Sequence, residues 1–315
     1  MRILFAGTSG IAVPVLRRIA SEFEIAGVLT ASDKPGARSQ KLVSSPVKIA
    51  AQELGLDIIQ CDHVNKTERI AVRALAPDTL VSFSFGRIFG PMFLGLFDRT
   101  MNIHPSPLPE ARGPAPVQAA ILSGNRNWAI SFQEIGLAMD TGRLYDVLKF
   151  NLDGTETTDS LTQAIAAMAA DRCVEVLSAI RDGSSQPVDQ KGDGSVCSLV
   201  SKEDGKLDFS LTALEVHSRI RAMYSWPKAF TALDGKPLFI TGVHGGFSDI
   251  DAEPEETAEP GTIMEIRKGL GMKVACADKA VWITRVQIPT KKEITFLDFA
   301  NQMKGISLVG QILGR

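Results

Sequence analysis

Residues 2–23 read RILFAGTSGIAVPVLRRIASEF, and this stretch decides the fold class. The run Arg2–Phe5 predicts a strand that is buried on both faces, and the glycines of residues 7–10 predict a tight turn. From Val13 to Phe23 the apolar residues recur at helical spacing. A buried strand, a glycine turn and an amphipathic helix in this order are typical of the first unit of a parallel α/β sheet.

The same alternation continues to residue 133, which predicts a doubly wound, mostly parallel α/β sheet with helices on both faces. A long alanine-rich helix is expected at Thr158–Ile180. Between these limits we expect strands at Ile25–Thr30, Asp57–Ile59, Thr79–Phe83, Thr100–Ile103 and Ala129–Gln133, and helices at Val47–Leu54, Ile70–Leu75 and Pro114–Ser123.

The composition changes after this helix. Residues 181–205 are rich in Gly, Ser, Asp and Lys, which is typical of a segment that runs over the surface. The sequence therefore predicts a catalytic domain at 1–190, a linker at 191–205 and a smaller domain at 206–315. Because its apolar runs are short and separated by turns, we expect the smaller domain to be an antiparallel barrel or sandwich. Its predicted elements are a helix at Leu211–Tyr224 and strands at Pro237–Thr241, Gly261–Ile266, Val274–Ala277 and Ala280–Val286.

Composition excludes several classes of protein. The 315 residues are 44% hydrophobic and 22% charged, with a formal net charge of −2, so a polyanionic partner would need a local basic patch. The four cysteines are scattered without a CxxC pair, which argues against a zinc ribbon and favours a reducing compartment. No apolar run approaches the roughly 18–20 residues that span a bilayer, and no leader precedes the first strand. We expect a soluble, cytoplasmic protein.

The strongest chemical signal is Asn102-Ile103-His104, at the end of a predicted strand. Asn102 and His104 are two residues apart, so their side chains point to the same face. Ligands of open α/β sheets bind at the carboxyl ends of the strands. A lone histidine is more often a packed core residue, but the adjacent amide and the proline-rich segment after it reverse those odds. An amide donor beside an imidazole suits stabilisation of an oxyanion together with proton transfer.

Two weaker signals accompany this pair. Asp140 lies in the segment Gly136–Gly142, where it is either a turn former or a placed carboxylate that would favour a charged His104 ring. Residues 33–42, DKPGARSQKL, carry Lys34, Arg38 and Lys41 and lack hydrophobic periodicity. That run is either a solvated loop or a basic loop that binds phosphates.

Taken together, these residues resemble the 10-formyltetrahydrofolate-dependent formyltransferases, and among them the family that acts on methionyl-tRNA. The resemblance covers the whole chain. The Asn, His and Asp trio of the family falls on Asn102, His104 and Asp140. Further matches are the family's GTPxFA turn at residues 7–12, its basic loop DRPAGRGKKL at 33–42, its SLLPxxRGxxPxQ loop at 106–118, and its IDWS, IRA and PWP elements at 206–210, 220–222 and 225–227.

The resemblance implies a Rossmann-like formyltransferase domain followed by an OB-like barrel that binds tRNA. It implies 10-formyltetrahydrofolate as co-substrate, initiator methionyl-tRNA as the acceptor, no metal, no membrane and a monomer. The tRNA contacts would be Arg38, Lys41 and Lys34. The folate contacts would be Phe85, Gly86, Ile88, Ser106, Pro107, Leu108, Pro109 and Met139.

The chain departs from the family pattern in the loop before Asp140. Gly136, Ala138 and Met139 replace an acid, a glycine and a leucine, and Phe85 replaces a tyrosine. Because the trio is shared by all formyl-folate transferases, an enzyme that acts on an amino sugar nucleotide is the nearest alternative. A non-catalytic RNA-binding protein has no need of the trio. An NAD enzyme is disfavoured because only the GxxG part of the GxGxxG signature is present.

Overall fold

The computed structural model describes residues 1–36, 42–255, 258–303 and 307–314. The chain folds into two compact units that interleave along the sequence. Unit 1 consists of residues 1–116, 129–150 and 162–198, and unit 2 of residues 117–128, 151–161 and 199–315.

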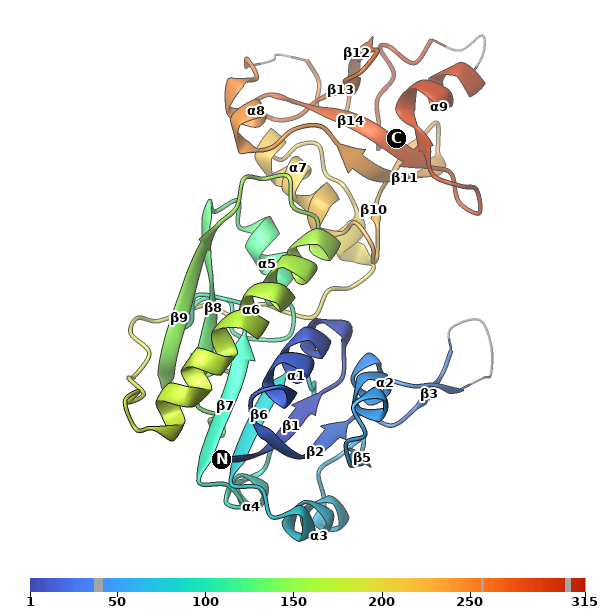
Figure 1. The fold of residues 1–315 in the computed structure, drawn as a ribbon. Helices are drawn as coiled ribbons and strands as arrows, with labels where there is room; N and C mark the ends of the chain where they lie inside the picture. Colours follow the sequence, from blue (N-terminus) through green and yellow to red (C-terminus); the bar gives the residue numbers. More distant parts are fainter. Residues whose placement is uncertain (37–41, 256–257, 304–306, 315) are drawn as a thin grey trace. The chain divides into compact units, whose positions relative to one another are not determined.

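The sheet of unit 1 confirms the predicted doubly wound, mostly parallel arrangement (Figure 1). Its strand order is β5-β2-β1-β6-β7-β8-β9. The first five strands in that order pair in parallel, and β8 is antiparallel to β7. The strands are β1 (Arg2–Gly7), β2 (Glu24–Thr30), β5 (Ile58–Gln60), β6 (Thr79–Phe83), β7 (Arg99–His104), β8 (Asn127–Gln133) and β9 (Leu144–Asn151).

Helices cover both faces of this sheet. Along β1, Ile3 and Phe5 alternate with Leu4 and Ala6, and all four are fully buried, so both faces of the strand are packed. One face joins a cluster with Val72 of α3 and the phenylalanines around α4, while α1 and α2 pack on each other and on β2. The helices of unit 1 are α1 (Val13–Ala20), α2 (Pro46–Glu53), α3 (Lys66–Leu75), α4 (Pro91–Leu94) and most of α6 (Thr158–Arg181), whereas α5 (Pro116–Leu122) belongs almost wholly to unit 2.

Several elements differ from the prediction. α3 begins at Lys66, four residues before the expected start, because Asn65 and Glu68 form a capping box. The helix expected at Val13–Phe23 ends at Ala20 in a turn. Strand β9 has no counterpart in the prediction, because its residues are half-buried or exposed and polar residues interrupt its apolar ones.

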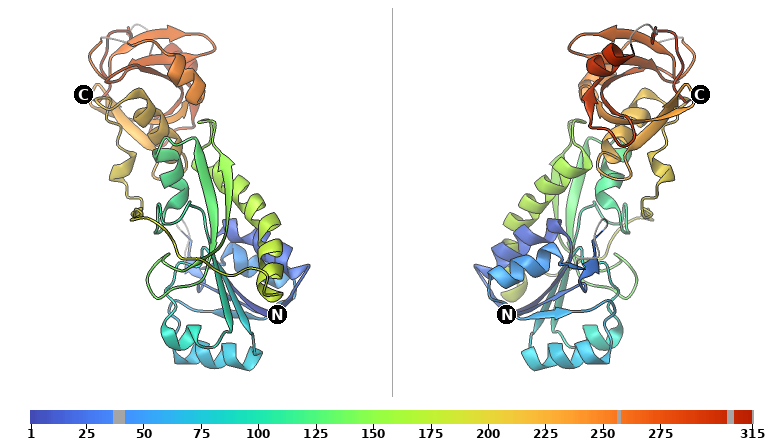
Figure 2. Two further views of the ribbon diagram at one scale, coloured as in Figure 1. Left: turned by 90° about the vertical axis from the view of Figure 1, so that its left-hand side faces the viewer. Right: turned by 90° about the vertical axis from the view of Figure 1, so that its right-hand side faces the viewer.

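Unit 2 contains an antiparallel sheet that closes into a small barrel (Figure 2). Its strand order is β10-β11-β14-β13-β12, and β15 pairs with β14. Residues 311–314 close it, because the Gln311 carbonyl accepts from Ile263 N of β12 at 2.8 Å and Gly314 N donates to Ala232 O of β10 at 2.8 Å. The strands are β10 (Ala229–Leu233), β11 (Lys236–Val243), β12 (Ile263–Arg267), β13 (Gly271–Ala275), β14 (Ala280–Gln287) and β15 (Ile294–Thr295).

The remaining elements are short, apart from α7. α7 spans Ala213–Ala222 rather than Leu211–Tyr224, since Thr212 caps it with Glu215. In the described part of the chain, no helix is long and apolar enough to cross a membrane. The other elements are β3 (Lys34–Pro35), which pairs with β4 (Leu42–Val43), the 3₁₀ helices Gly10–Ala12 and Glu203–Gly205, α8 (Phe247–Ala252) and α9 (Phe296–Gln302).

Candidate active site

Polar side chains gather on one face of the β7–β8 pair in unit 1. Asn102 lies opposite Gln133, and His104 lies opposite Ser131. Directly opposed residues of antiparallel strands point to the same face, so these four side chains form one polar group at the end of β7. His104, Ser131 and Gln133 are buried, whereas Asn102 is half-buried. No hydrogen bond from the described residues engages the Asn102 side chain, so its amide is free for a ligand.

The His104 ring is fixed through one of its nitrogens. Its Nε2 lies 3.0 Å from the carbonyl oxygen of Ala111, which can only accept, so Nε2 carries a proton. The Cys197 thiol lies 3.5 Å from the same carbonyl. Burial raises the pKa of that thiol, which keeps it protonated and able to donate. The other ring nitrogen, Nδ1, is therefore the one available for proton transfer.

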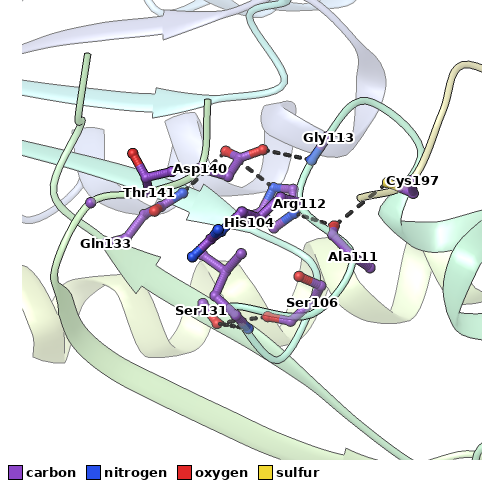
Figure 3. Close-up of polar contacts among 12 residues, drawn as sticks. His104, Ser106, Ala111, Arg112, Gly113, Ser131, Gln133, Asp140, Thr141 and Cys197 are labelled. Atoms are coloured by element: carbon purple, nitrogen blue, oxygen red, sulfur yellow. Dashed lines mark hydrogen bonds and ion pairs between the residues drawn. The ribbon is translucent and has the colours of Figure 1, made fainter. Parts of the chain in front are cut away.

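Asp140 supplies the carboxylate that faces Nδ1. Its Oδ1 lies 3.6 Å from His104 Nδ1, beyond hydrogen-bond range, and its side chain is 12% exposed. The carboxylate also accepts from Gly113 N at 2.8 Å and from Gln133 Nε2 at 3.1 Å (Figure 3). Asp140 has φ +54°, a left-handed conformation that aspartate tolerates better than most residues. The structure thus brings together the trio singled out in the sequence.

The loop after β7 is held by Ser131 of β8 and by the segment that follows α6. The Ser106 carbonyl accepts from Ser131 Oγ at 2.6 Å, and Leu108 N donates to Ser131 Oγ at 3.1 Å. Ala111 N donates to Ser195 Oγ at 2.9 Å. At Gly113, with φ +118°, an added Cβ would lie 2.3 Å from the Cys197 carbonyl oxygen, so only glycine fits there.

These contacts give the site a defined chemistry. An amide donor and an imidazole face one spot, and a carboxylate lies behind the imidazole. Such a group can stabilise negative charge on a carbonyl oxygen and accept a proton from an attacking amine. Within the described residues, no group of three or more His, Cys, Asp or Glu side chains could hold a metal ion.

The side chains predicted to bind folate occupy two different environments. Ile88 and Met139 are 79% and 60% exposed, and Gly86 has φ +73° with open space where a Cβ would stand. Phe85 is instead 3% exposed and its ring stacks on Phe89, so the ring belongs to the core and only the main chain of Phe85 is left to contact a ligand. The remaining predicted contacts lie in the loop after β7, where Ser106 and Leu108 are buried and Pro107 and Pro109 are half-buried.

The predicted tRNA contacts fall mostly outside the described residues. Arg38 and Lys41 lie outside them, and Lys34 is exposed at the start of the β3–β4 pair. Lys48, which follows the same loop, forms an ion pair with Asp33 at 2.6 Å. Its charge is therefore neutralised within the protein.

Sequence reasoning missed three contributors to the site. Gln133 binds the Asp140 carboxylate, Ala111 anchors His104, and Gln190 bonds to the main chain of the Asp140 loop. Gln133 could have been suspected, because it is a polar residue ending an apolar run predicted to be a buried strand. Ala111 acts through its carbonyl and Gln190 is 50 residues from Asp140, so neither left a local signal.

The chain matches two family models, described as formyl transferase over residues 1–177 and as formyl transferase, C-terminal domain, over residues 199–304. The chain belongs to the formyl transferase family. A protein of Sorangium cellulosum named methionyl-tRNA formyltransferase is 35% identical over 320 residues, with 100% of both chains covered. The resemblance to this family inferred from the sequence is thus confirmed.

Solved structures share the fold. HypX from Aquifex aeolicus in complex with tetrahydrofolic acid matches with a TM-score of 0.61 at 20% identity, covering 97% of this chain and 48% of that one. An N-formyltransferase from Helicobacter canadensis, in complex with folinic acid and dTDP-3-aminofucose, matches with a TM-score of 0.64 at 17% identity. That match covers 89% of this chain and 97% of the other.

Proposed function

We propose that this chain transfers the formyl group of 10-formyltetrahydrofolate to the amino group of initiator methionyl-tRNA. The observation that carries the proposal is the convergence of Asn102, His104 and Asp140 in a chain of this family. The acceptor is supported by the full-length relatives named methionyl-tRNA formyltransferase. An aminoacyl-tRNA is used in translation initiation, so we propose the cytoplasm as the compartment.

The reaction forms a C–N bond between the methionyl amine and the formyl carbon and breaks the C–N bond to the folate. The proton lost by the amine is returned to the folate nitrogen. The Asn102 amide and the His104 ring stabilise the charge that develops on the formyl oxygen. The Asp140 carboxylate, which faces His104 Nδ1, helps to remove the amine proton, directly or through a water.

The co-substrate fits the residues that surround this group. We propose that the exposed side chains of Ile88 and Met139 and the open main chain at Gly86 hold the flat apolar part of the folate. The segment Ser106–Pro109 would form the opposite wall, and Phe85 would hold the loop in place from the core. 10-Formyltetrahydrofolate, when bound, supplies the formyl carbon.

For tRNA, we propose the basic loop with Lys34, Arg38 and Lys41 together with the domain at 206–315. Cations in a loop and a small barrel are common means of holding a nucleic acid backbone. We further propose that residues 1–190 carry the chemistry, that 191–205 link the two parts, and that the enzyme acts as a monomer. Light scattering with and without tRNA would check the last point.

The decisive experiment is a formyl-transfer assay with formylfolate and charged initiator tRNA. The wild-type chain should formylate methionyl-tRNA, and His104→Ala and Asp140→Ala should fold but lose most turnover, because each removes a reacting group. A nucleotide-linked 4-amino sugar is the competing acceptor. Preference for the sugar, or near-wild-type rates in either variant, would overturn the proposal.

A further inference from the structure

The segment that follows α6 returns to the candidate active site. Val188 forms a bridge with Leu144 of β9, and Val196 forms a bridge with Arg112 of the loop after β7. Gln190 lies between these two points. Its half-buried side chain bonds to Arg112 in the loop after β7 and to the loop that carries Asp140. Gln190 thus links the Arg112 loop to the Asp140 loop, beside the direct bond from Gly113 N to the Asp140 carboxylate.

The chemistry of Arg112 sets the orientation of the Gln190 amide. A guanidinium can only donate, and Arg112 Nη2 and Nε lie 2.6 and 3.2 Å from one amide atom of Gln190. That atom must be the oxygen, Oε1. The amide nitrogen consequently faces the Asp140 loop, where it donates to Asp140 O at 2.9 Å and to Gly142 O at 2.8 Å.

The amide also reaches the carboxylate of Asp140 through a second glutamine. Gln190 Nε2 lies 3.4 Å from Gln133 Oε1, and Gln133 Nε2 donates to Asp140 Oδ1 at 3.1 Å. The Gln190 amide has two hydrogens for three acceptors, so the longest of these contacts, to Gln133, shares a hydrogen with another. The Gln133 amide presents its nitrogen to the carboxylate, because a carboxylate can only accept.

The main chain of Asp140 needs such support. A non-glycine residue in the left-handed region costs on the order of 1–3 kcal/mol and persists only where its surroundings hold it. Asp140 has φ +54°, and Gln190 binds its carbonyl and that of Gly142 two residues on. Because the carboxylate lies 3.6 Å from His104 Nδ1, a small change in this backbone would separate the pair.

We propose that Gln190 is a positioning residue for formyl transfer, which holds Asp140 against His104 without touching the substrates. The inference rests on the proposed function of this site. A carboxamide suits position 190 because it offers an acceptor to Arg112 and two donor hydrogens to the Asp140 loop. A glutamate there would keep the bond to Arg112 but set a negative oxygen against two carbonyl oxygens.

The kinetic test compares Gln190→Ala and Gln190→Glu with wild type in the formyl-transfer assay. Both should lower kcat, on the order of 10²-fold for a misplaced reacting group, with the KM for both substrates unchanged. Gln186→Ala is the matched control, since Gln186 is exposed on the same segment and its amide donates only to Gly183 O. A Gln190→Ala variant with the kcat of the control would overturn the inference.

A double-mutant cycle tests whether Gln190 acts through Asp140. In the Asp140→Asn background, Gln190→Ala should cost no further activity, because the interaction it supports is already lost. Two independent losses that multiply would show that Gln190 acts elsewhere and would refute the inference. Thermal melting of every variant distinguishes a local effect from unfolding, which would lower Tm and kcat together.

A readout without turnover separates this inference from the proposed function. Histidine ¹⁵N NMR of the full chain, with His104 assigned from His104→Ala, reports on the charge near its Nδ1. Gln190→Ala should shift the His104 resonances, and Gln186→Ala should leave them in place. If the wild type fails to formylate methionyl-tRNA, the proposed function is refuted. If the His104 resonances do not shift in Gln190→Ala, the positioning role is refuted.

Discussion

At the scale of single residues, the candidate site depends on which atoms already have partners. His104 Nε2 is taken by the Ala111 carbonyl, and both oxygens of Asp140 accept hydrogen bonds from Gly113 and Gln133. Asn102 differs, because the described residues leave its side chain free. Because this donor gives up no bond within the protein, turning it toward a substrate oxygen costs little free energy. We therefore propose that Asn102 makes the direct contact with the formyl oxygen.

Replacing Asn102 by alanine tests this assignment. We expect kcat to fall about 10²–10³-fold, the usual cost of one lost oxyanion donor, with little change in Tm because the side chain bonds to nothing else that the structure describes. Asn125→Ala is the control, since Asn125 is exposed in the turn before β8. Steady-state kinetics measures both variants. An Asn102→Ala enzyme as fast as the control would remove Asn102 from the mechanism.

At the scale of elements, helix α7 of unit 2 carries a buried histidine that must stay neutral. His217 Nε2 faces the carbonyls of His244 and Gly245 at 3.2 and 3.1 Å, so it donates. Its Nδ1 accepts from Arg221 Nε at 3.0 Å and cannot also bind a proton. Burial, followed by the charge of Arg221, lowers the pKa of His217 to about 4, although the two carbonyls and Asp249 oppose the shift.

The stability of the protein should therefore fall with acidification below the ordinary pKa of histidine. Between pH 6.5 and about 4 the unfolded chain binds a proton at His217 and the folded chain does not, so the free energy of unfolding decreases as the pH falls. At 1.36 kcal/mol per pKa unit, the loss amounts to about 3 kcal/mol. Denaturant midpoints measured across this range would show it.

His217→Gln is the informative variant, because an amide can accept from Arg221 and donate to the carbonyls without titrating. It should flatten the pH dependence even if it lowers stability at neutral pH. His63→Gln, at an exposed position, is the control. The same slope in His217→Gln and wild type would mean that other groups cause the acid sensitivity.

At the scale of the whole molecule, the net charge of the protein disfavours binding of the proposed tRNA substrate. The net charge is −2, so attraction to a polyanion must come from a local group of cations. Lys48 is paired with Asp33 and contributes little to such a group. Lys34, Arg38 and Lys41 remain as the cations of the loop at residues 33–42.

Replacing Arg38 and Lys41 together by alanine should raise the KM for methionyl-tRNA and leave folate binding unchanged. Affinity for tRNA should fall with salt in the wild type, and the slope of log K against log salt should decrease by about 1–2 in the variant, since two phosphate contacts are lost. Lys66→Ala with Arg73→Ala removes the same charge from the exposed side of α3. If the two double variants change tRNA binding equally, the loss of net charge explains both effects and the loop has no binding role of its own.

Much of the fold could be predicted because its signals are local. The buried runs that became β1, β2 and β6 and the helical spacing that became α1 and α2 reflect periodicities of the chain itself. β9 could not be predicted, because polar residues such as Asp146 and Lys149 interrupt its pattern and only pairing beside β8 makes it a strand. Closure of the barrel by residues 311–314 also depends on partners far along the chain.

For the site, the sequence by itself determined that Asn102 and His104 share a face at the end of a strand, since a period of two fixes that relation wherever the strand lies. Only the tertiary structure decided that Asp140 Oδ1 lies 3.6 Å from His104 Nδ1 and that Gln190 bonds to the main chain of the Asp140 loop. Such contacts join residues 36 and 50 positions apart, and no local pattern encodes them. They follow from the packing of the β8–β9 connection and the segment after α6 against the end of β7.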